Sequence, residues 1–216
     1  MKVTDQTRIQ CPACGVKSRF VAHRAVDGVT QPELKAKLLD GSIGDFVCRA
    51  CHQSVMVQHS LLYADLARNT MIDFADEGER STSNEATFGP GVSAALGKLS
   101  TRRVTRYLDL VEKIIALDAG LDDRIVEVLK FVIRTPEGRD AELSLAEASP
   151  DELFFITLVG GRPMFDMLRL PRSGYTALEE QLRGSPVLDP PAPWAEIDRD
   201  WAARMMAAHA VLRTAH

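Results

Sequence analysis

Four cysteines are the residues of this chain whose types and spacing point most directly to chemistry. Cys11 and Cys14 form one C-x-x-C pair, and Cys48 and Cys51 form a second. Two residues between the thiols allow both sulfurs of a tight turn to face one ion, and two such turns supply the four thiolates of a tetrahedral Zn²⁺ site. The chain has four cysteines, so the two pairs use all of them. The sequence therefore predicts one structural zinc ion bound by these residues.

The stretch between the two pairs bears on whether they can close one site. Gly15 follows the first pair, where the turn often requires a positive φ that glycine adopts without steric cost. The gap from Gly15 to Val47 is 33 residues, counted inclusively, whereas short zinc ribbons use roughly 15–20. A helix predicted over residues 31–40 lies inside this gap. We interpret it as an insertion between the two cysteine turns.

Other sites use similar cysteine patterns. Cys48 to His52 matches the C-x-x-C-H of haem attachment, which requires export and would leave the first pair without a role. Cys11 and Cys14 resemble a thioredoxin-type redox turn, but such turns follow a strand and open a helix. Here a strand-like stretch follows Cys14, and little chain precedes Cys11. A hydrolytic zinc keeps an open ligand position, which four thiolates would not leave. A thiol-redox protein or an enzyme that uses the pairs is the alternative function.

Histidines and catalytic signatures give less information. His23, His52 and His59 could replace or orient a cysteine ligand, and the sequence leaves this open. The chain contains no phosphate-binding loop, dinucleotide fingerprint or nucleophile elbow. We therefore expect no catalytic residues and no cofactor besides zinc. The expected function is that of a non-enzymatic binding or adaptor protein.

The charge balance bears on the kind of partner. The 216 residues carry a net charge of −4, from 26 basic and 30 acidic side chains. A nucleic-acid-binding protein usually carries a basic excess on one face. This chain has no overall basic excess, although Arg19, Arg24, Lys35 and Lys37 could gather on one face. Nucleic acid is therefore disfavoured, and we expect the partner to be another protein. No apolar run has the length of a signal peptide or a membrane span. We expect a cytoplasmic protein that does not bind membranes, and the sequence does not predict its oligomeric state.

The patterning of apolar residues divides the chain into three regions and predicts an α+β fold. Residues 1–76 are expected to form a zinc-ribbon-like module of short antiparallel strands with the helix inserted. Residues 77–100 are polar and interrupted by Gly89-Pro90-Gly91, which predicts a linker or mobile loop. Residues 101–216 are expected to form an α-rich α+β region.

The spacing of apolar residues also predicts the elements inside these regions. In the first module, strands are expected over residues 18–24, 55–63 and 70–75. In the α-rich region, the pattern predicts a helical hairpin, with one helix from residue 101 to Gly120 and a second capped by Asp122 or Asp123. It further predicts a β-hairpin of residues 153–159 and 164–170, a short helix over 175–182 and a long C-terminal helix over 194–212.

Five stretches of the chain resemble the CpXC-domain proteins of bacteria and archaea. They are Ile9-Gln10-Cys11-Pro12-Ala13-Cys14-Gly15, Cys48-Arg49-Ala50-Cys51, Leu61-Leu62-Tyr63-Ala64-Asp65, Glu112-Lys113-Ile114 and Gly120-Leu121-Asp122-Asp123. The resemblance covers roughly residues 5 to 135. In that family the second pair usually contains a proline, where this chain has Arg49, and is followed by a glycine, where it has His52. The resemblance implies the family's fold and a zinc site at the four cysteines, and it implies no activity.

Overall fold

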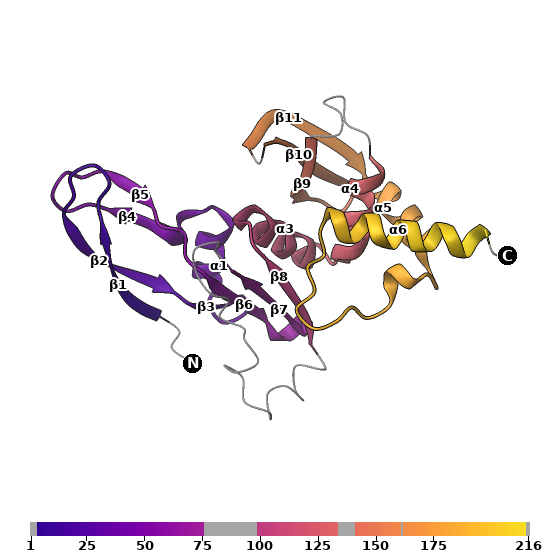
Figure 1. The fold of residues 1–216 in the computed structure, drawn as a ribbon, viewed down its shortest axis with the longest axis horizontal. Helices are drawn as coiled ribbons and strands as arrows, with labels where there is room; N and C mark the ends of the chain where they lie inside the picture. The colour runs from indigo at the N-terminus through magenta and orange to yellow at the C-terminus, as the bar shows by residue number, and fades with distance from the viewer. Residues whose placement is uncertain (1–3, 76–98, 134–140, 161, 215–216) are drawn as a thin grey trace. The chain divides into compact units, whose positions relative to one another are not determined.

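The protein has a mixed α+β fold in a computed structural model that describes residues 4–75, 99–133, 141–160 and 162–214 (Figure 1). Within these residues it contains five α-helices and four small β-sheets. The chain divides into two compact units, one ending at Tyr107 and the other beginning at Leu108. None of the described helices is both long and apolar enough to cross a membrane.

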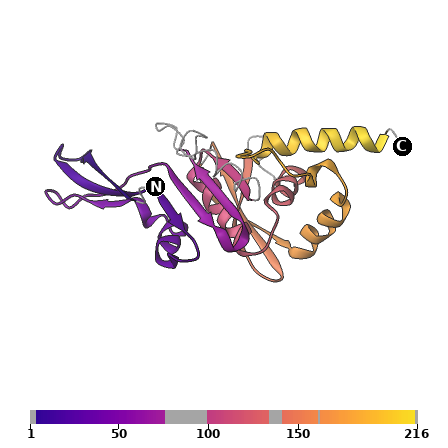
Figure 2. The same cartoon turned by 90° about the horizontal axis from the view of Figure 1, so that it is seen from below.

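Two short antiparallel hairpins form the part of the first unit that carries the cysteines, and they lie side by side in both views (Figures 1 and 2). The first pairs β1 (Thr4–Gln10) with β2 (Lys17–His23), and the second pairs β4 (Asp45–Val47) with β5 (Ser54–Met56). Phe20 and Ala22 of β2 and Phe46 of β4 are buried at alternate positions, and Ile9 and Val55 are partly buried beside them, which is the pattern expected of strands with one covered face. The predicted strand over residues 18–24 is confirmed as β2.

A four-stranded sheet completes the first unit, in the order β3-β6-β7-β8. Its strands are β3 (Ala25–Asp27), β6 (Leu61–Asp65), β7 (Thr70–Phe74) and β8 (Ser100–Val104). β6 and β7 are antiparallel, whereas the outer pairs β3–β6 and β7–β8 are parallel. The antiparallel pair confirms the strand predicted over residues 70–75.

The predicted inserted helix is confirmed as α1 (Pro32–Leu39). Pro32 occupies the first turn of this helix, where a backbone N–H would have no carbonyl partner within the helix, so the missing N–H of proline costs no hydrogen bond. Gly41, with a φ of 83°, follows its end. The hydroxyl of Tyr107 donates a hydrogen bond to the carbonyl of Leu38, a buried residue near the end of the helix. This bond ties the end of the insertion to the last residue of the first unit.

Three predictions for the first unit were wrong or incomplete. The predicted strand over residues 55–63 is two strands, β5 and β6, which belong to different sheets. The predicted helix does not begin at residue 101, because residues 100–104 form β8 beside β7, with Val104 opposite Phe74. β1 was not predicted at all, since most of its side chains are polar and exposed. The predicted linker, residues 77–100, lies outside the described residues except for its last two positions.

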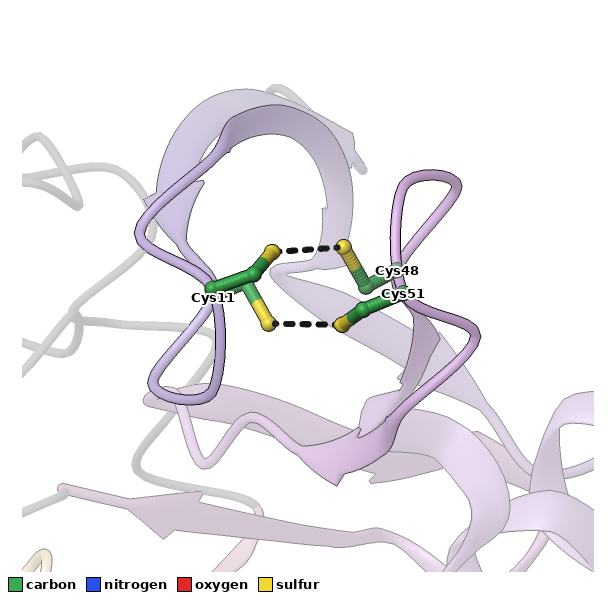
Figure 3. A group of neighbouring side chains, drawn as sticks. Cys11, Cys48 and Cys51 are labelled. Atoms are coloured by element: carbon green, nitrogen blue, oxygen red, sulfur yellow. Dashed lines mark hydrogen bonds between the residues drawn. The ribbon is translucent and has the colours of Figure 1, made fainter.

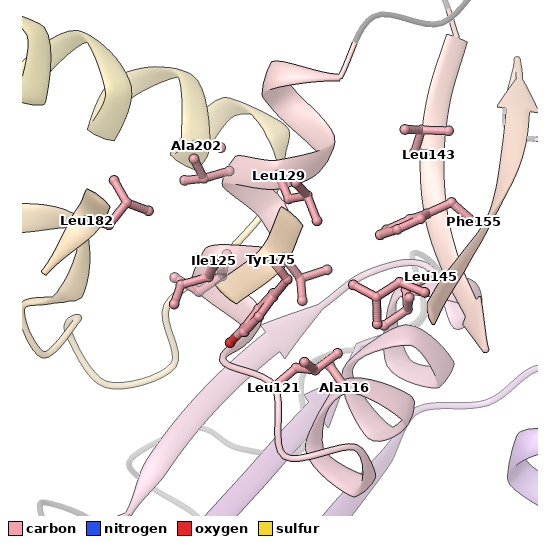
Figure 4. Close-up of a cluster of buried hydrophobic side chains, with 14 of the residues drawn as sticks. Ala116, Leu121, Ile125, Leu129, Leu143, Leu145, Phe155, Tyr175, Leu182 and Ala202 are labelled. Atoms are coloured by element: carbon pink, nitrogen blue, oxygen red, sulfur yellow. The ribbon is translucent and has the colours of Figure 1, made fainter. Parts of the chain in front are cut away.

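The second unit packs helices on a three-stranded antiparallel sheet with the order β11-β10-β9. The strands are β9 (Ala141–Ala148), β10 (Glu152–Val159) and β11 (Arg162–Pro171). The helices are α3 (Tyr107–Asp118), whose first residue closes the first unit, α4 (Asp123–Val132), α5 (Arg172–Leu182) and α6 (Arg199–Thr214). Their shared core includes Ile125 and Leu129 of α4, Phe155 of β10 and Tyr175 of α5 (Figure 4). The predicted β-hairpin is confirmed as β10–β11, and Asp122 caps α4 by accepting from the Arg124 N–H.

The second unit also differs from the prediction at two places. β9 was not predicted, because its Ala, Glu and Ser residues do not favour a strand locally, but Leu143 and Leu145 alternate into the core. The C-terminal helix begins at Arg199 and not at residue 194. Trp194 has a φ of 57°, which no residue inside an α-helix adopts. Ile197, which falls inside the predicted helix, is a buried residue that precedes the observed one.

A cluster of five charged side chains, of which Glu112, Lys113 and Glu127 are buried, joins α3 to α4 inside the second unit. The Lys113 ammonium lies 3.2 Å from Asp123 Oδ2 and 3.5 Å from Glu127 Oε1. The Lys130 ammonium lies 2.6 Å from Glu112 Oε1 and 2.8 Å from Glu127 Oε1. Burial lowers the pKa of Lys113, but the surrounding carboxylates outweigh burial and raise that pKa above its ordinary value. Burial likewise lowers the pKa of Lys130, and Glu112 and Glu127 outweigh it and raise that pKa, so both lysines stay charged inside the unit.

Candidate metal centre

The four cysteines lie in the two turns at the tips of the hairpins. Cys11 follows the last residue of β1, and Cys48 follows the last residue of β4. The N–H of Cys11 donates to the carbonyl of Val16 over 3.0 Å, and the N–H of Cys48 donates to the carbonyl of Gln53 over 2.9 Å. Each bond spans five residues and closes the turn at the base. The two turns therefore share one backbone hydrogen-bond pattern, although their sequences differ.

A second shared bond and a shared backbone angle fix the residue after each pair. The N–H of Gly15 donates to the Cys11 carbonyl over 2.9 Å, and the N–H of His52 donates to the Cys48 carbonyl over 2.8 Å. Gly15 has a φ of 73° and His52 a φ of 59°. The positive φ expected at Gly15 is confirmed, and His52 adopts the same conformation without being glycine. Histidine is among the residue types that tolerate this region best.

The four sulfur atoms converge on one point between the turns. Cys11 Sγ lies 3.7 Å from Cys51 Sγ, and Cys14 Sγ lies 3.6 Å from Cys48 Sγ. All four lie within 4.8 Å of one another, and Cys11 faces Cys48 and Cys51 across the gap (Figure 3). Zn–S bonds of roughly 2.3 Å in a tetrahedron place sulfurs about 3.8 Å apart. Disulfide sulfurs lie about 2.05 Å apart, so the cysteines are unbonded thiols spaced to hold one metal ion.

The first cysteine of each pair faces inward and the second faces outward. Cys11 and Cys48 are buried, whereas Cys14 and Cys51 are exposed. The buried two belong to a small apolar cluster with Phe20, Ala22 and Phe46. This cluster contains only five buried residues, so its apolar area is small. The hairpins therefore depend on the cysteine site for much of their contact.

The turns favour an ionised thiolate at one cysteine and oppose it at another. Backbone N–H groups of Cys51 and Ala50 lower the pKa of Cys48 to about 6. A backbone N–H from Val16 lowers the pKa of Cys14, but the neighbouring thiols, Cys51 first, and the loss of water contact outweigh it and raise that pKa to about 12. Four thiolates cannot gather at this distance without a cation between them. Metal binding would supply that cation and deprotonate all four.

None of the three candidate histidines joins the sulfur cluster among the described residues. His52 is exposed in the second turn. His59 is buried below the hairpins, with Nδ1 3.1 Å from the carbonyl of Val57 and Nε2 3.2 Å from the carbonyl of His23. Burial lowers the pKa of His23. The structure therefore places none of these three histidines as a ligand of the sulfur cluster.

The arrangement bears on the rival sites considered above. A strand, β1, does precede Cys11, as it would in a thioredoxin-type turn, but β2 and not a helix follows Cys14. Among the residues that the structure describes, no helix therefore opens at the first pair. Four thiolates around one ion also fill a tetrahedral site and leave no position for a reactive water. The geometry suits a structural ion.

The sequence comparisons give one match. A family model described as "CpXC protein" matches residues 9–130, which is more than half of the chain and includes all four cysteines. No curated protein and no solved structure matches the chain.

Proposed function

The chain belongs to the CpXC protein family, and from that premise we propose that it is a zinc-binding protein whose single ion is structural and which acts by binding another protein. The four cysteines Cys11, Cys14, Cys48 and Cys51 hold the ion in this proposal. The main support for this proposal is the spacing of the four sulfur atoms, which is 3.6 and 3.7 Å for the two nearest pairs. A tetrahedron of thiolates is the ligand set typical of structural zinc.

The proposed role of the ion is to hold the two hairpins together. Each hairpin has only two strands, and an isolated pair of strands is marginally stable in water. The apolar cluster between them contains two cysteines among its five buried residues. In small zinc modules the binding free energy is partly folding free energy, on the order of 10 kcal/mol. Without the ion, the hairpins would lose their main cross-connection.

A thiol-redox protein or an enzyme that uses the cysteine pairs is the second candidate. The observations in its favour are the exposure of Cys14 and Cys51 and the lowered pKa of Cys48. Both are also expected of a thiolate metal site, since the same N–H groups that lower a thiol pKa stabilise a metal-bound sulfur. The absence of a helix at either turn in the described residues weighs against a redox turn.

Thiol reactivity separates the two candidates. The purified chain is treated with a thiol reagent, first without and then with a zinc chelator. The proposal predicts thiols that react slowly until the chelator is added, and then four that react together with release of one zinc ion per chain. Two thiols that form a reversible disulfide in a metal-free chain would instead support the redox protein.

A further inference from the structure

The first hairpin has a second face, which points away from the apolar cluster and the cysteines. The buried side chains of β2, Phe20 and Ala22, point inward, and the residues between them are exposed. Arg8 on β1 and Lys17 and Arg19 on β2 lie at exposed outward positions. We call these three residues the cationic strip. The outward positions 6, 8, 10, 17, 19 and 21 include no acidic residue.

The strand register places these cations close together. Arg8 lies directly opposite Arg19, and Gln10 lies opposite Lys17. Cβ atoms of directly opposite residues are about 4.5–5.5 Å apart, and like charges at such positions destabilise a sheet. Replacing one arginine with a neutral strand-forming residue would relieve this repulsion. The paired arginines therefore weaken the hairpin that carries the first cysteine turn.

No counter-charge among the described residues offsets this repulsion. Within the described part of the chain, none of Arg8, Lys17 and Arg19 makes an ion pair or a side-chain hydrogen bond. Arg24, which the sequence allowed to gather with Arg19 on one face, instead lies 3.9 Å from Asp5 and donates to the carbonyl of Ser60. Three exposed cations that make no ion pair with a described residue favour an anionic ligand.

We propose that the cationic strip binds an extended acidic segment of a partner protein, which rests on and deepens the binding role proposed above. Lys17 and Arg19 are two residues apart on one strand, about 6.6 Å at 3.3 Å per residue. An extended peptide repeats its side chains at the same spacing, so acidic residues at alternate positions meet both cations. Arg8, across from Arg19, can bind the same carboxylate or the next one, and guanidinium groups bind carboxylates through two parallel hydrogen bonds.

The strip favours a protein segment over a nucleic acid. Proteins that bind single strands stack bases on exposed aromatic side chains, and the outward positions of this hairpin carry none. Phe20, the one phenylalanine, tyrosine or tryptophan of β1 and β2, is buried. Three cations also neutralise few phosphates, and the chain as a whole is acidic, at −4.

The test uses the full zinc-loaded chain and a short labelled peptide of alternating glutamate and threonine. Fluorescence anisotropy should show binding that weakens as salt rises, and the same peptide with glutamine in place of glutamate should not bind. The double variant R8T/R19T should bind the acidic peptide at least about tenfold more weakly, because each substitution removes a charge-assisted hydrogen bond to a peptide carboxylate. The matched control R199T/R204T removes two exposed arginines of α6 and should bind like the wild type.

Measurements of thermal stability and zinc content show whether a variant of the cationic strip has lost only its binding site or has failed to fold. The single variant R8T should keep its zinc and unfold at the same temperature as the wild type or a higher one, since it relieves the opposition to Arg19. The inference would be overturned if the acidic peptide did not bind. It would also be overturned if the double variant R8T/R19T bound the peptide as tightly as the wild type. Arginine-dependent binding to a single-stranded oligonucleotide but not to the peptide would overturn it as well. Zinc retained in either case would leave the proposed metal role standing.

Discussion

Gly15 and His52 occupy equivalent positions in the two cysteine turns, and both have a positive φ, 73° and 59°. Each donates its N–H to the carbonyl of the first cysteine in its own turn. The two turns thus have the same backbone, and the family's usual glycine is replaced at one of them by a residue that adopts the same conformation. This equivalence leads to the first prediction.

Gly15→Ala should destabilise the first turn by about 1–2 kcal/mol, because a Cβ in the left-handed region approaches the following carbonyl. Space is not the reason, since the added Cβ would meet only Gln10 Nε2, at an ordinary 3.6 Å. His52→Gly should be tolerated, as it removes the same strain from the second turn. Thermal unfolding of the zinc-loaded variants measures both effects.

Gly174→Ala is the matched control for that comparison. Gly174 lies in α5, has no positive φ, and an added Cβ would meet nothing within 4 Å. It should be neutral or slightly stabilising, since alanine favours a helix. Equal losses from Gly15→Ala and Gly174→Ala would show that the turn conformation is not the cause.

The charged cluster of the second unit predicts a large effect at Lys113. Lys113→Met should lower the free energy of unfolding by about 3–5 kcal/mol, because it removes the ammonium that lies beside the part-buried Asp123 and leaves the buried Glu127 with Lys130 alone. It also removes the donor to the carbonyl of Ile197, now bonded over 2.7 Å. Denaturant unfolding monitored by circular dichroism gives the value.

Arg183→Met supplies the control for the charged cluster. Arg183 and Glu180 form an ion pair at 2.7 Å, but their side chains are 72% and 60% exposed. An exposed pair contributes about 0–1 kcal/mol. If both substitutions had small and similar effects, the buried cluster would not be important for the stability of this unit.

The raised pKa values of two tyrosines lead to a predicted loss of stability at alkaline pH. Burial raises the pKa of Tyr107 to about 12, and burial likewise raises the pKa of Tyr175 to about 12, from an ordinary value of 10. The folded state therefore favours the neutral hydroxyl, so this contribution is complete below pH 10 and is lost as the pH rises from 10 through 12. Ultraviolet titration of phenolate absorbance should show late ionisation in the folded chain.

The same titration in denaturant provides the comparison for the tyrosines. All three tyrosines of the chain should then ionise near pH 10. Tyr107→Phe should remove one late-ionising group from the folded chain and leave the late ionisation of Tyr175 in place. Ionisation of all three near pH 10 in the folded chain would contradict the burial of these hydroxyls.

Much of the candidate site could be predicted from the sequence because it depends on local rules. The C-x-x-C spacing brings two sulfurs to one turn whatever surrounds it, and Pro32 and Gly41 mark the ends of the inserted helix. The conformation of His52 is a different case, since histidine has no strong preference for it. Only the equivalence with Gly15 reveals why that position needs a positive φ.

The elements that were missed depend on contacts distant in sequence. β8 is a strand because Val104 and its neighbours pair with β7, whereas their local spacing also fits a helix. Glu112 and Lys113 would be assigned to a solvated helix face by residue type, but partners on α4 make their burial possible. β1 contributes few apolar residues, so its signal is weak although it forms half of the cysteine-bearing hairpin.

Removal of the metal should loosen the hairpins and leave the second unit folded. With a chelator present, hydrogen exchange should increase across residues 9–23 and 45–56, and remain slow in α3 and α4. This is the expected behaviour if the order of the two cysteine-bearing hairpins depends on zinc. Equal loss of protection along the whole chain would mean that the metal stabilises one cooperative fold.

The most direct measurement of the central claim is the metal content of the intact chain. Native mass spectrometry with elemental analysis should find one zinc ion per chain in protein purified without added chelator. Cys14→Ser and Cys48→Ser should each reduce zinc retention, because either change removes one of the four thiolates. A chain that carries no metal and has four freely reactive thiols, or one that keeps its zinc in both variants, would contradict the four-cysteine site.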